Sequence, residues 1–184
     1  MTKTKINHRD IYHPLRWTGQ ETLFLTTIQR RMADGGDGAF NFDTEPDYQR
    51  GHVWSDRQAS QFVGHLIEGG SVPPIVINTD PTYARSDEIV DGKQRLTAVC
   101  RWLNGEVPAE LTDGRKVNYG DLDEESQRYL TSLSGPTITA NYVQLPRSEV
   151  LRLYLRLNRG GTIHTDAEID RVRGLLAEAT TKNG

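Results

Sequence analysis

The chain has 184 residues, of which 22 are Lys or Arg and 25 are Asp or Glu, so its formal net charge is -3 at pH 7. This length is enough for one compact core, with or without an appended arm. The acidic balance argues against a protein that binds DNA through its overall charge, but it leaves room for a local basic groove.

The first part of the chain is polar, and apolar periodicity begins only after it. Residues 1–18 read as an irregular arm. Residues 20–33 predict a helix, because their larger apolar side chains fall roughly on one helical face. That face consists of Leu23, Phe24, Ile28 and Met32. The run Asp34-Gly35-Gly36-Asp37-Gly38 predicts a loop. We therefore divide the chain into an N-terminal arm and helix, residues 1–38, and a main domain, residues 39–184.

The next segment combines short strands with a loop that is rich in binding groups. Residues 39–42 predict a strand, and the loop of residues 47–54 follows. This loop is dense in Gln, Arg, His and aromatic side chains, which are suited to binding as much as to packing. A helix then begins after Ser55, which should form a capping box with Gln58. Two prolines lead from this helix into a buried strand at residues 75–77.

The most informative segment is Asp91-Gly92-Lys93-Gln94-Arg95, between a predicted strand at residues 88–90 and a predicted helix at residues 93–104. A strand that turns through Gly into a helix leaves the first helical amides without partners. These amides and the helix dipole attract anions, phosphate above all. The two cations of the segment add positive charge, and its Asp is a candidate magnesium ligand or proton acceptor. The same residues also suit an ordinary corner with a solvated basic turn, and the segment alone does not decide between the two.

A single cysteine, Cys100, lies on the apolar stripe of that helix, so we expect a buried hydrophobic residue and not a nucleophile. One cysteine allows no disulfide within the chain, which suits a reducing compartment. No apolar run reaches the length of a membrane span, and the N-terminus lacks a signal-peptide core. We therefore expect a soluble, cytoplasmic protein without a membrane partner. The histidines show no ligand spacing, so a zinc site is not expected.

Strands and helices continue in mixed order to the C-terminus. The turn Thr112-Asp113-Gly114 predicts a small hairpin over residues 110–117. The further predicted elements are a helix at 121–130, a strand at 137–143, a helix at 149–158 capped by Ser148, and a helix at 166–180 capped by Thr165. The last two helices flank a double Gly, which allows backbone geometry closed to other residues. This mixed order predicts an α+β domain with a small sheet.

Arginines recur at helical spacing near the C-terminus. Arg152, Arg156 and Arg159 can share one face, and Arg147 precedes them. One interpretation is a solvated surface with pairs to acidic neighbours such as Glu149. The other is a groove that holds DNA phosphates and positions a duplex without reading its sequence.

Four segments stand out when they are considered together. They are Tyr48-Gln49-Arg50 with Trp54, Pro73-Pro74-Ile75-Val76-Ile77, Asp91-Gly92-Lys93-Gln94-Arg95 and Leu157-Asn158-Arg159-Gly160-Gly161. In this order and spacing, over residues 40–172, they resemble the N-terminal domain of GmrSD-type modification-dependent restriction systems, in the ParB/sulfiredoxin superfamily. One departure is Lys93, where the family usually has Gln. The resemblance implies a ParB/sulfiredoxin-like fold, in which a small mixed sheet packs with helices and further helices follow at the C-terminus.

The resemblance also implies a domain that binds and hydrolyses a nucleoside triphosphate with Mg²⁺ and acts on DNA. A separate nuclease subunit and a homodimer are further partners to consider. The predicted catalytic residues are Asp91, Lys93, Arg95 and Asp47, with Asp91 also as the metal ligand. The predicted nucleotide-binding residues are Gln49, Arg50, Gly92, Gln94, Asn158, Gly160 and Gly161. The predicted DNA-binding residues are Tyr48, His52, Arg152, Arg156 and Arg159. Trp54 is expected to pack against the core.

Three functions remain open from the sequence. The first is an NTP-dependent enzyme acting on DNA, such as one half of a two-protein restriction system. The second is a phosphotransferase that moves a γ-phosphate to a hydroxyl of a small molecule or of a hydroxymethylated base. The third is a non-catalytic module that senses a nucleotide. Phosphoryl transfer depends on positioning and charge neutralisation, which Arg50, Lys93 and Arg95 with a metal would supply.

Overall fold

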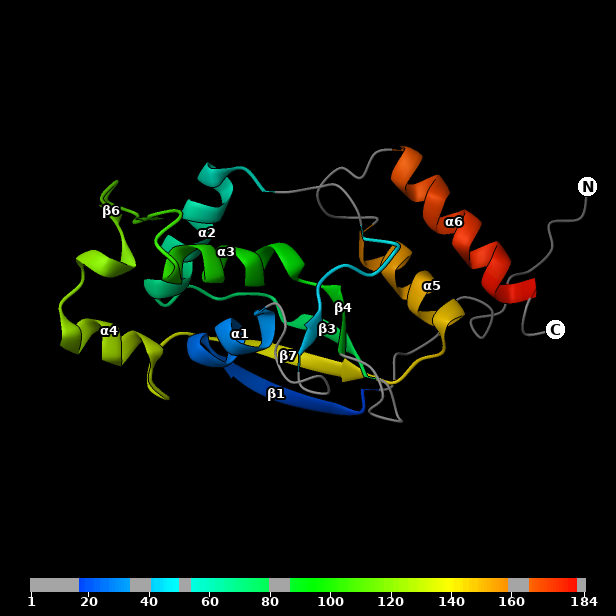
Figure 1. Cartoon of the computed structure of the whole chain (residues 1–184), viewed down its shortest axis with the longest axis horizontal. Coiled ribbons are helices and arrows are strands. Elements are labelled where there is room, and N and C mark those ends of the chain that lie inside the picture. The colour runs from blue at the N-terminus through cyan, green and yellow to red at the C-terminus, as the bar shows by residue number, and fades with distance from the viewer. Residues whose placement is uncertain (1–16, 34–40, 50–53, 80–86, 159–165, 182–184) are drawn as a thin grey trace, which may run out of the picture.

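The computed structural model describes residues 17–33, 41–49, 54–79, 87–158 and 166–181. It combines helices and a mixed sheet, which confirms the predicted α+β class (Figure 1). The strands are β1 (Gly19–Phe24), β2 (Phe42–Asp43), β3 (Ile75–Asn78), β4 (Asp87–Asp91), β5 (Ala109–Glu110), β6 (Lys116–Val117) and β7 (Thr137–Val143). The helices are α1 (Leu25–Met32), α2 (Asp56–Ile67), α3 (Lys93–Leu103), α4 (Glu124–Thr131), α5 (Arg147–Asn158) and α6 (Asp166–Thr181), with a 3-10 turn η2 (Tyr119–Asp121).

Five strands form one mixed sheet in the order β1-β7-β3-β4-β2, and β5 and β6 form a separate hairpin. β7 pairs antiparallel with β1 and parallel with β3. β4 pairs antiparallel with β3 and parallel with β2. The pairing with β2 ends at Asp43 opposite Glu88. Beyond Glu88, the outer edge of β4 therefore has no strand partner among the described residues.

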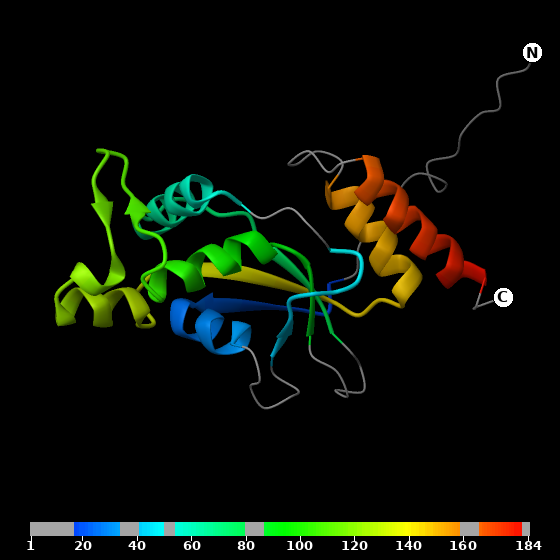
Figure 2. The ribbon, with the colours of Figure 1, turned by 45° about the horizontal axis from the view of Figure 1, so that its top comes forward.

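The two faces of the sheet carry separate cores, because side chains alternate along each strand. Ile75 and Ile77 join a cluster with α1, α2 and α3, whereas Val76 between them joins a second cluster with α5 and α6. In β4, Ile89 belongs to the first cluster and Val90 to the second. Figure 2 shows α5 and α6 together at one end of the molecule, with the β5–β6 hairpin and α4 at the other. The central strands thus connect the two cores.

The predicted helix at residues 20–33 is wrong in its first part. Residues Gly19–Phe24 form β1, which pairs with β7 without a break, and only Leu25–Met32 are helical. The ladder with β7 satisfies the backbone of β1, and this tertiary pairing outweighs the local helical pattern. β1 therefore belongs to the main sheet, and both β1 and α1 contribute side chains to the first core.

Most other predicted elements lie at or near their expected places. The helix after Ser55 has the predicted capping box, in which the Ser55 amide donates to Gln58 Oε1 at 2.9 Å and the Gln58 amide donates to Ser55 Oγ at 3.3 Å. The strand at 137–143 and the hairpin at 110–117 are also confirmed. The structure does not describe the predicted arm before residue 17, the predicted loop at Asp34–Gly38 or the predicted cap Thr165.

Two predicted helix starts are wrong. α4 begins at Glu124, later than predicted, because the Asp123 carboxylate accepts a first-turn amide at 2.7 Å and caps the helix there. α5 begins at Arg147, so Ser148 lies inside its first turn and is not the cap. The carbonyl of Pro146 accepts two first-turn amides of α5, at 2.9 and 3.1 Å.

A buried arginine links α1 to the sheet. Arg31 is only 8% exposed, and its guanidinium donates to Asp87 at 2.5 Å and to the Tyr142 hydroxyl at 2.8 Å. It also contacts Glu21 at 3.2 Å and lies 4.0 Å from the centre of the Phe42 ring. Burial raises the pKa of Asp87, and the Arg31 charge opposes that rise. No periodicity predicts this cluster, because its members come from distant parts of the chain.

Candidate functional site

The turn between β4 and α3 has the geometry that its sequence predicts. Gly92 precedes the helix with φ 106° and ψ 4°, a left-handed conformation that favours glycine. A Cβ at this position would lie 2.3 Å from Ile75 Cγ2, so the turn has no room for a side chain. The Gly92 carbonyl accepts the Leu96 amide at 3.1 Å, which starts α3, and in the described part of the chain no side chain caps this end. The first-turn amides of α3 can therefore receive an anion.

A bulge in β4 directs Asp91 toward the α5 side of the sheet. Asp91 lies opposite Val76 and Ile89 lies opposite Ile77, so Val90 is an extra residue between them. Opposed residues share a face of a sheet, and Val76 belongs to the core that α5 covers. Asp91 is thus turned away from the first core. Bulges commonly re-aim a side chain beside a functional site.

Asp91 and Arg95 form an ion pair one helical turn apart. Arg95 Nη2 donates to Asp91 Oδ2 at 2.6 Å. The same guanidinium donates to the carbonyl of Pro73 and reaches the carbonyl of Pro74 at 3.4 Å. Its side chain is 12% exposed, against 36% for Asp91. Arg95 therefore joins α3 to the segment before β3, and the Asp91 carboxylate is the more accessible member of the pair.

Lys93 lies at the start of the same helix. Its ammonium is 3.8 Å from Glu45 Oε1, at the outer limit of an ion pair, and the Glu45 side chain is 87% exposed. Such a contact is worth little in water, at most about 1 kcal/mol. Lys93 is therefore the cation of the segment that can most readily turn to an incoming anion.

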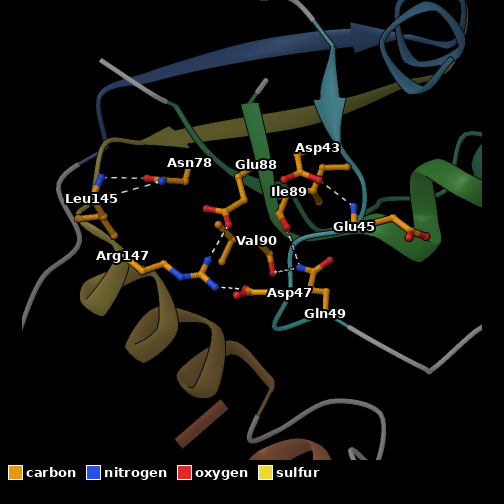
Figure 3. A network of polar contacts seen from close by, with 10 residues as sticks. All are labelled: Asp43, Glu45, Asp47, Gln49, Asn78, Glu88, Ile89, Val90, Leu145 and Arg147. Carbon is orange, nitrogen blue, oxygen red and sulfur yellow. Dashed lines mark hydrogen bonds and ion pairs between the residues drawn. The ribbon is translucent and has the colours of Figure 1, made fainter. Parts of the chain in front are cut away.

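Residues 44–49, here called the strap, follow β2 and lie along the edge of β4 beyond its pairing with β2. The Gln49 side-chain amide donates to the carbonyls of Ile89 and Val90, at 2.7 Å each (Figure 3). Both residues lie beyond Glu88, the last residue of β4 that pairs with β2. Beyond the strap, the amide of Trp54 donates to Gln94 Oε1 at 3.0 Å. Gln49 and Gln94, which were predicted to bind nucleotide, therefore bind backbone groups in the structure. Gln49 binds β4 just before the Arg50 position, and Gln94 binds Trp54 just after the His52 position.

The two aromatic residues of this region are packing residues in the structure. Tyr48 is 2% exposed, and its ring meets the edge of Tyr154 at 4.9 Å between centroids. Burial is the main cause that raises the pKa of its hydroxyl. The Tyr48 ring therefore has no exposed face on which a DNA base could stack. Trp54 packs against the first core and contacts Phe62 at 5.3 Å between centroids, which confirms the predicted packing role.

Arg147 binds two carboxylates at once (Figure 3). Its Nη1 donates to Glu88 at 2.9 Å and its Nη2 donates to Asp47 on the strap. The guanidinium also lies 4.8 Å from the centre of the Tyr48 ring. Burial raises the pKa of Glu88, and the Arg147 charge opposes that rise. The sequence places Arg147 among the surface arginines, so it did not predict this network. A carboxylate next to the apolar pair Ile89-Val90 was the one available signal.

The exposed arginines of α5 lie apart from this network. Arg152 is half-exposed and donates to Glu149 one turn earlier, and Arg156 is exposed. On α6, Arg173 pairs with Asp170 at 3.0 Å. These contacts are pairs between close neighbours on one helix, as the solvated interpretation predicts, and they leave the positive charges at the surface.

The structure brings together some predicted site residues but not all of them. Asp91, Gly92, Lys93 and Arg95 meet at the start of α3, and Gln49 and Gln94 flank them. Asp47 lies in the Arg147 network instead. The predicted residues outside the described part of the chain are Arg50, His52, Arg159, Gly160 and Gly161, and the side chain of Asn158 is also not described.

Two other kinds of site find no support in the part of the chain that the structure describes. No three His, Cys, Asp or Glu side chains gather there as metal ligands, so a metal at Asp91 would depend on that carboxylate and on ligands from a substrate. Cys100 is partly buried against the first core, less than predicted, and burial raises its pKa to about 11, which disfavours the reactive thiolate. None of the described helices has the length and hydrophobicity needed to cross a lipid bilayer.

A mixed sheet with a glycine turn into α3 defines an α+β domain with a candidate anion site. The family model described as the N-terminal domain of GmrSD restriction endonuclease matches residues 32–171, so the chain belongs to this family. Neither the curated proteins nor the solved structures contain a match to the chain. The family thus rests on the sequence, and the likeness to the ParB/sulfiredoxin fold stays a prediction.

Proposed function

We propose that this chain is a nucleotide-dependent domain of a restriction system, which binds a nucleoside triphosphate with Mg²⁺ at the start of α3, hydrolyses it and acts on DNA. The family supports the link to restriction and to DNA, because its description names a restriction endonuclease. The observation that carries the nucleotide part is the left-handed Gly92 turn, which leaves the first amides of α3 without a side-chain cap in the described structure.

The charges around this turn suit phosphate groups. Helix amides and Lys93 would hold the phosphates, while Asp91, with one oxygen bonded to Arg95, would ligate Mg²⁺ through the other. Magnesium commonly binds one or two carboxylates together with phosphate oxygens and waters, so one exposed carboxylate is sufficient. Bound Mg²⁺ would neutralise phosphate charge, and the protein would position the nucleotide.

DNA cleavage is assigned to a separate nuclease subunit, because the proposed chemistry of this chain is limited to the nucleotide. The exposed arginines of α5, Arg152 and Arg156, are the proposed DNA contacts. Their end of the molecule lies opposite the β5–β6 hairpin (Figure 2). A homodimer remains a further prediction for the same system.

Replacing Asp91 with Asn is expected to lower Mg²⁺-dependent turnover by at least about tenfold, since an amide is a poor ligand for magnesium and a poor base. The free energy of unfolding should change by less than about 1 kcal/mol, because the Asn amide oxygen still accepts a hydrogen bond from Arg95. The measurement is phosphate release and label transfer from γ-labelled ATP, with and without hydroxymethylated DNA. Release to water supports hydrolysis, and transfer of the label to DNA indicates a phosphotransferase.

Asp113→Asn is the matched control, because Asp113 also pairs with an arginine, Arg115 at 2.7 Å, but lies on the distant hairpin. It should leave turnover unchanged. If Asp91→Asn keeps the turnover of the parent protein, the catalytic role of this carboxylate is wrong.

Reversing the charge of Arg152 and Arg156 together is expected to weaken DNA binding, while nucleotide binding stays within about twofold. A site with three or four phosphate contacts should show a log–log salt slope of about -3 to -4, and the double variant should have a shallower slope. The measurement is a fluorescence-anisotropy titration of duplex DNA at several salt concentrations, with nucleotide and Mg²⁺ present.

The control for this pair is Arg115→Glu with Lys116→Glu, which makes the same change in net charge at the hairpin. Both control residues are exposed. Equal losses in the two double variants would show that only net charge matters, and no binding at low salt would refute the DNA proposal.

A further inference from the structure

Arg147 connects three elements that are distant in the sequence. It begins α5, binds Glu88 on β4 at 2.9 Å and binds Asp47 on the strap (Figure 3). It also lies over the ring of Tyr48. The start of α5 is fixed further by Asn78 on β3. Its side-chain oxygen accepts the amide of Leu145 at 2.8 Å. Side chains of the central strands β3 and β4 therefore hold the first residue of α5 and the segment just before it.

Glu88 is the less exposed of the two carboxylates that bind Arg147. The Glu88 side chain is only 18% exposed, whereas Asp47 is 55% exposed. A positive charge at a helix N-terminus opposes the helix dipole, so the two carboxylates must account for its place there. Because Glu88 is only partly exposed, removing Arg147 would leave the Glu88 charge poorly compensated.

The shape of the guanidinium explains why the residue is an arginine. One nitrogen reaches Glu88, a second reaches Asp47, and the central carbon of the guanidinium lies 4.8 Å from the centre of the Tyr48 ring. A lysine has one nitrogen on a flexible stem and cannot make these three contacts together.

The strap that Arg147 holds reaches the proposed site at two points. Gln49 donates to the carbonyl of Val90 at 2.7 Å, directly before Asp91, and Glu45 Oε1 lies 3.8 Å from the Lys93 ammonium. We propose that Arg147 is a positioning residue of the nucleotide site, which holds the strap and α5 in register with the start of α3. This inference rests on the proposed function, and it assigns Asp47 to positioning in place of the catalytic role that the sequence predicted.

The test compares Arg147→Met and Arg147→Lys with Arg101→Met in the full chain. Arg101 is a matched control, because it also binds two carboxylates, Asp56 at 2.7 Å and Glu106 at 3.4 Å, but both are exposed and lie outside the site. Hydrogen–deuterium exchange of the strap and of α5 is measured without nucleotide, and the nucleotide Kd is measured by titration. Arg147→Met should speed exchange of the strap and raise Kd, each by about tenfold, with a smaller effect for Arg147→Lys and none for Arg101→Met.

A pH series adds a readout that simple loss of packing would not change. The groups that face Glu88 are Arg147 from α5, Asp43 from β2, Asp47 and Tyr48 from the strap, and Asn78 from β3. Burial already raises the pKa of Glu88, and without the opposing Arg147 charge its folded-state pKa should lie still further above its unfolded value. Stability should then fall more as pH rises between the two values. The loss of Tm in Arg147→Met should therefore be larger at about pH 7 than at about pH 5.

The outcomes separate the inference from the proposed function. Faster strap exchange with an unchanged nucleotide Kd, or unchanged exchange in Arg147→Met, overturns the positioning role. If the parent protein binds no nucleotide, the proposed function fails. Faster strap exchange would then show only that Arg147 stabilises the strap. If Arg147→Met does not fold, Asp47→Ala is tested instead. Asp47 is half-exposed, and its replacement removes only the contact between Arg147 and the strap. It should speed strap exchange and raise Kd, and an effect on turnover alone would return Asp47 to a catalytic role.

Discussion

Replacing Gly92 with alanine is expected to lower the free energy of unfolding by about 3 kcal/mol. Left-handed backbone costs an alanine about 1–2 kcal/mol. The new Cβ would also lie 2.3 Å from Ile75 Cγ2 and 2.7 Å from Ile75 Cβ, and forcing an extra carbon into a packed core typically costs about 1–3 kcal/mol more. Because Ile75 is fully buried on the central strand β3, it cannot move aside freely. Urea unfolding monitored by circular dichroism measures the change.

Gly105→Ala separates the two causes. Gly105 has φ 75°, also in the left-handed region, but a Cβ there would meet nothing within 4 Å. It should lose only the conformational part, about 1–2 kcal/mol. Equal losses at the two glycines would show that the collision with Ile75 does not occur, and the close approach of the turn to β3 would then be wrong.

Replacing Arg95 with alanine is expected to weaken nucleotide binding by about tenfold to hundredfold, which corresponds to the loss of a charge-assisted contact of about 1.5–3 kcal/mol. The effect has two sources. A positive charge beside the phosphates would be lost, and Asp91 would lose the guanidinium that holds its carboxylate at 2.6 Å. Stability should also fall, because Arg95 donates to the carbonyls of Pro73 and Pro74 before β3. Nucleotide titration and thermal unfolding of the same variant give the two numbers.

Arg101→Ala on the same helix is the control, since it removes an arginine whose carboxylate partners lie elsewhere. It should leave nucleotide affinity unchanged. If Arg95→Ala binds every nucleoside triphosphate within about twofold of the parent protein, Arg95 is only a structural residue, and the proposed site loses one of its two cations.

Local patterns predicted the elements whose stability depends on neighbours in the sequence. The capping box at Ser55 and Gln58 and the helix at Lys93–Leu103 follow from side chains a few positions apart. The glycine turn at Gly92 follows from the residue type, because few other residues adopt its backbone angles. The wrong prediction at residues 20–33 shows the limit, since pairing with β7 decides the conformation of Gly19–Phe24.

The sequence by itself determined the family, the α+β class and the short segment that forms the candidate site, because each depends on residue identity and spacing along the chain. Only the tertiary structure decided which polar groups bind other parts of the protein. It directs Gln49 to the open edge of β4, buries Tyr48, and pairs Arg147 with Glu88 and Asp47. Such pairings join residues far apart in the chain, and their strength depends on burial, which no spacing along one strand or helix records.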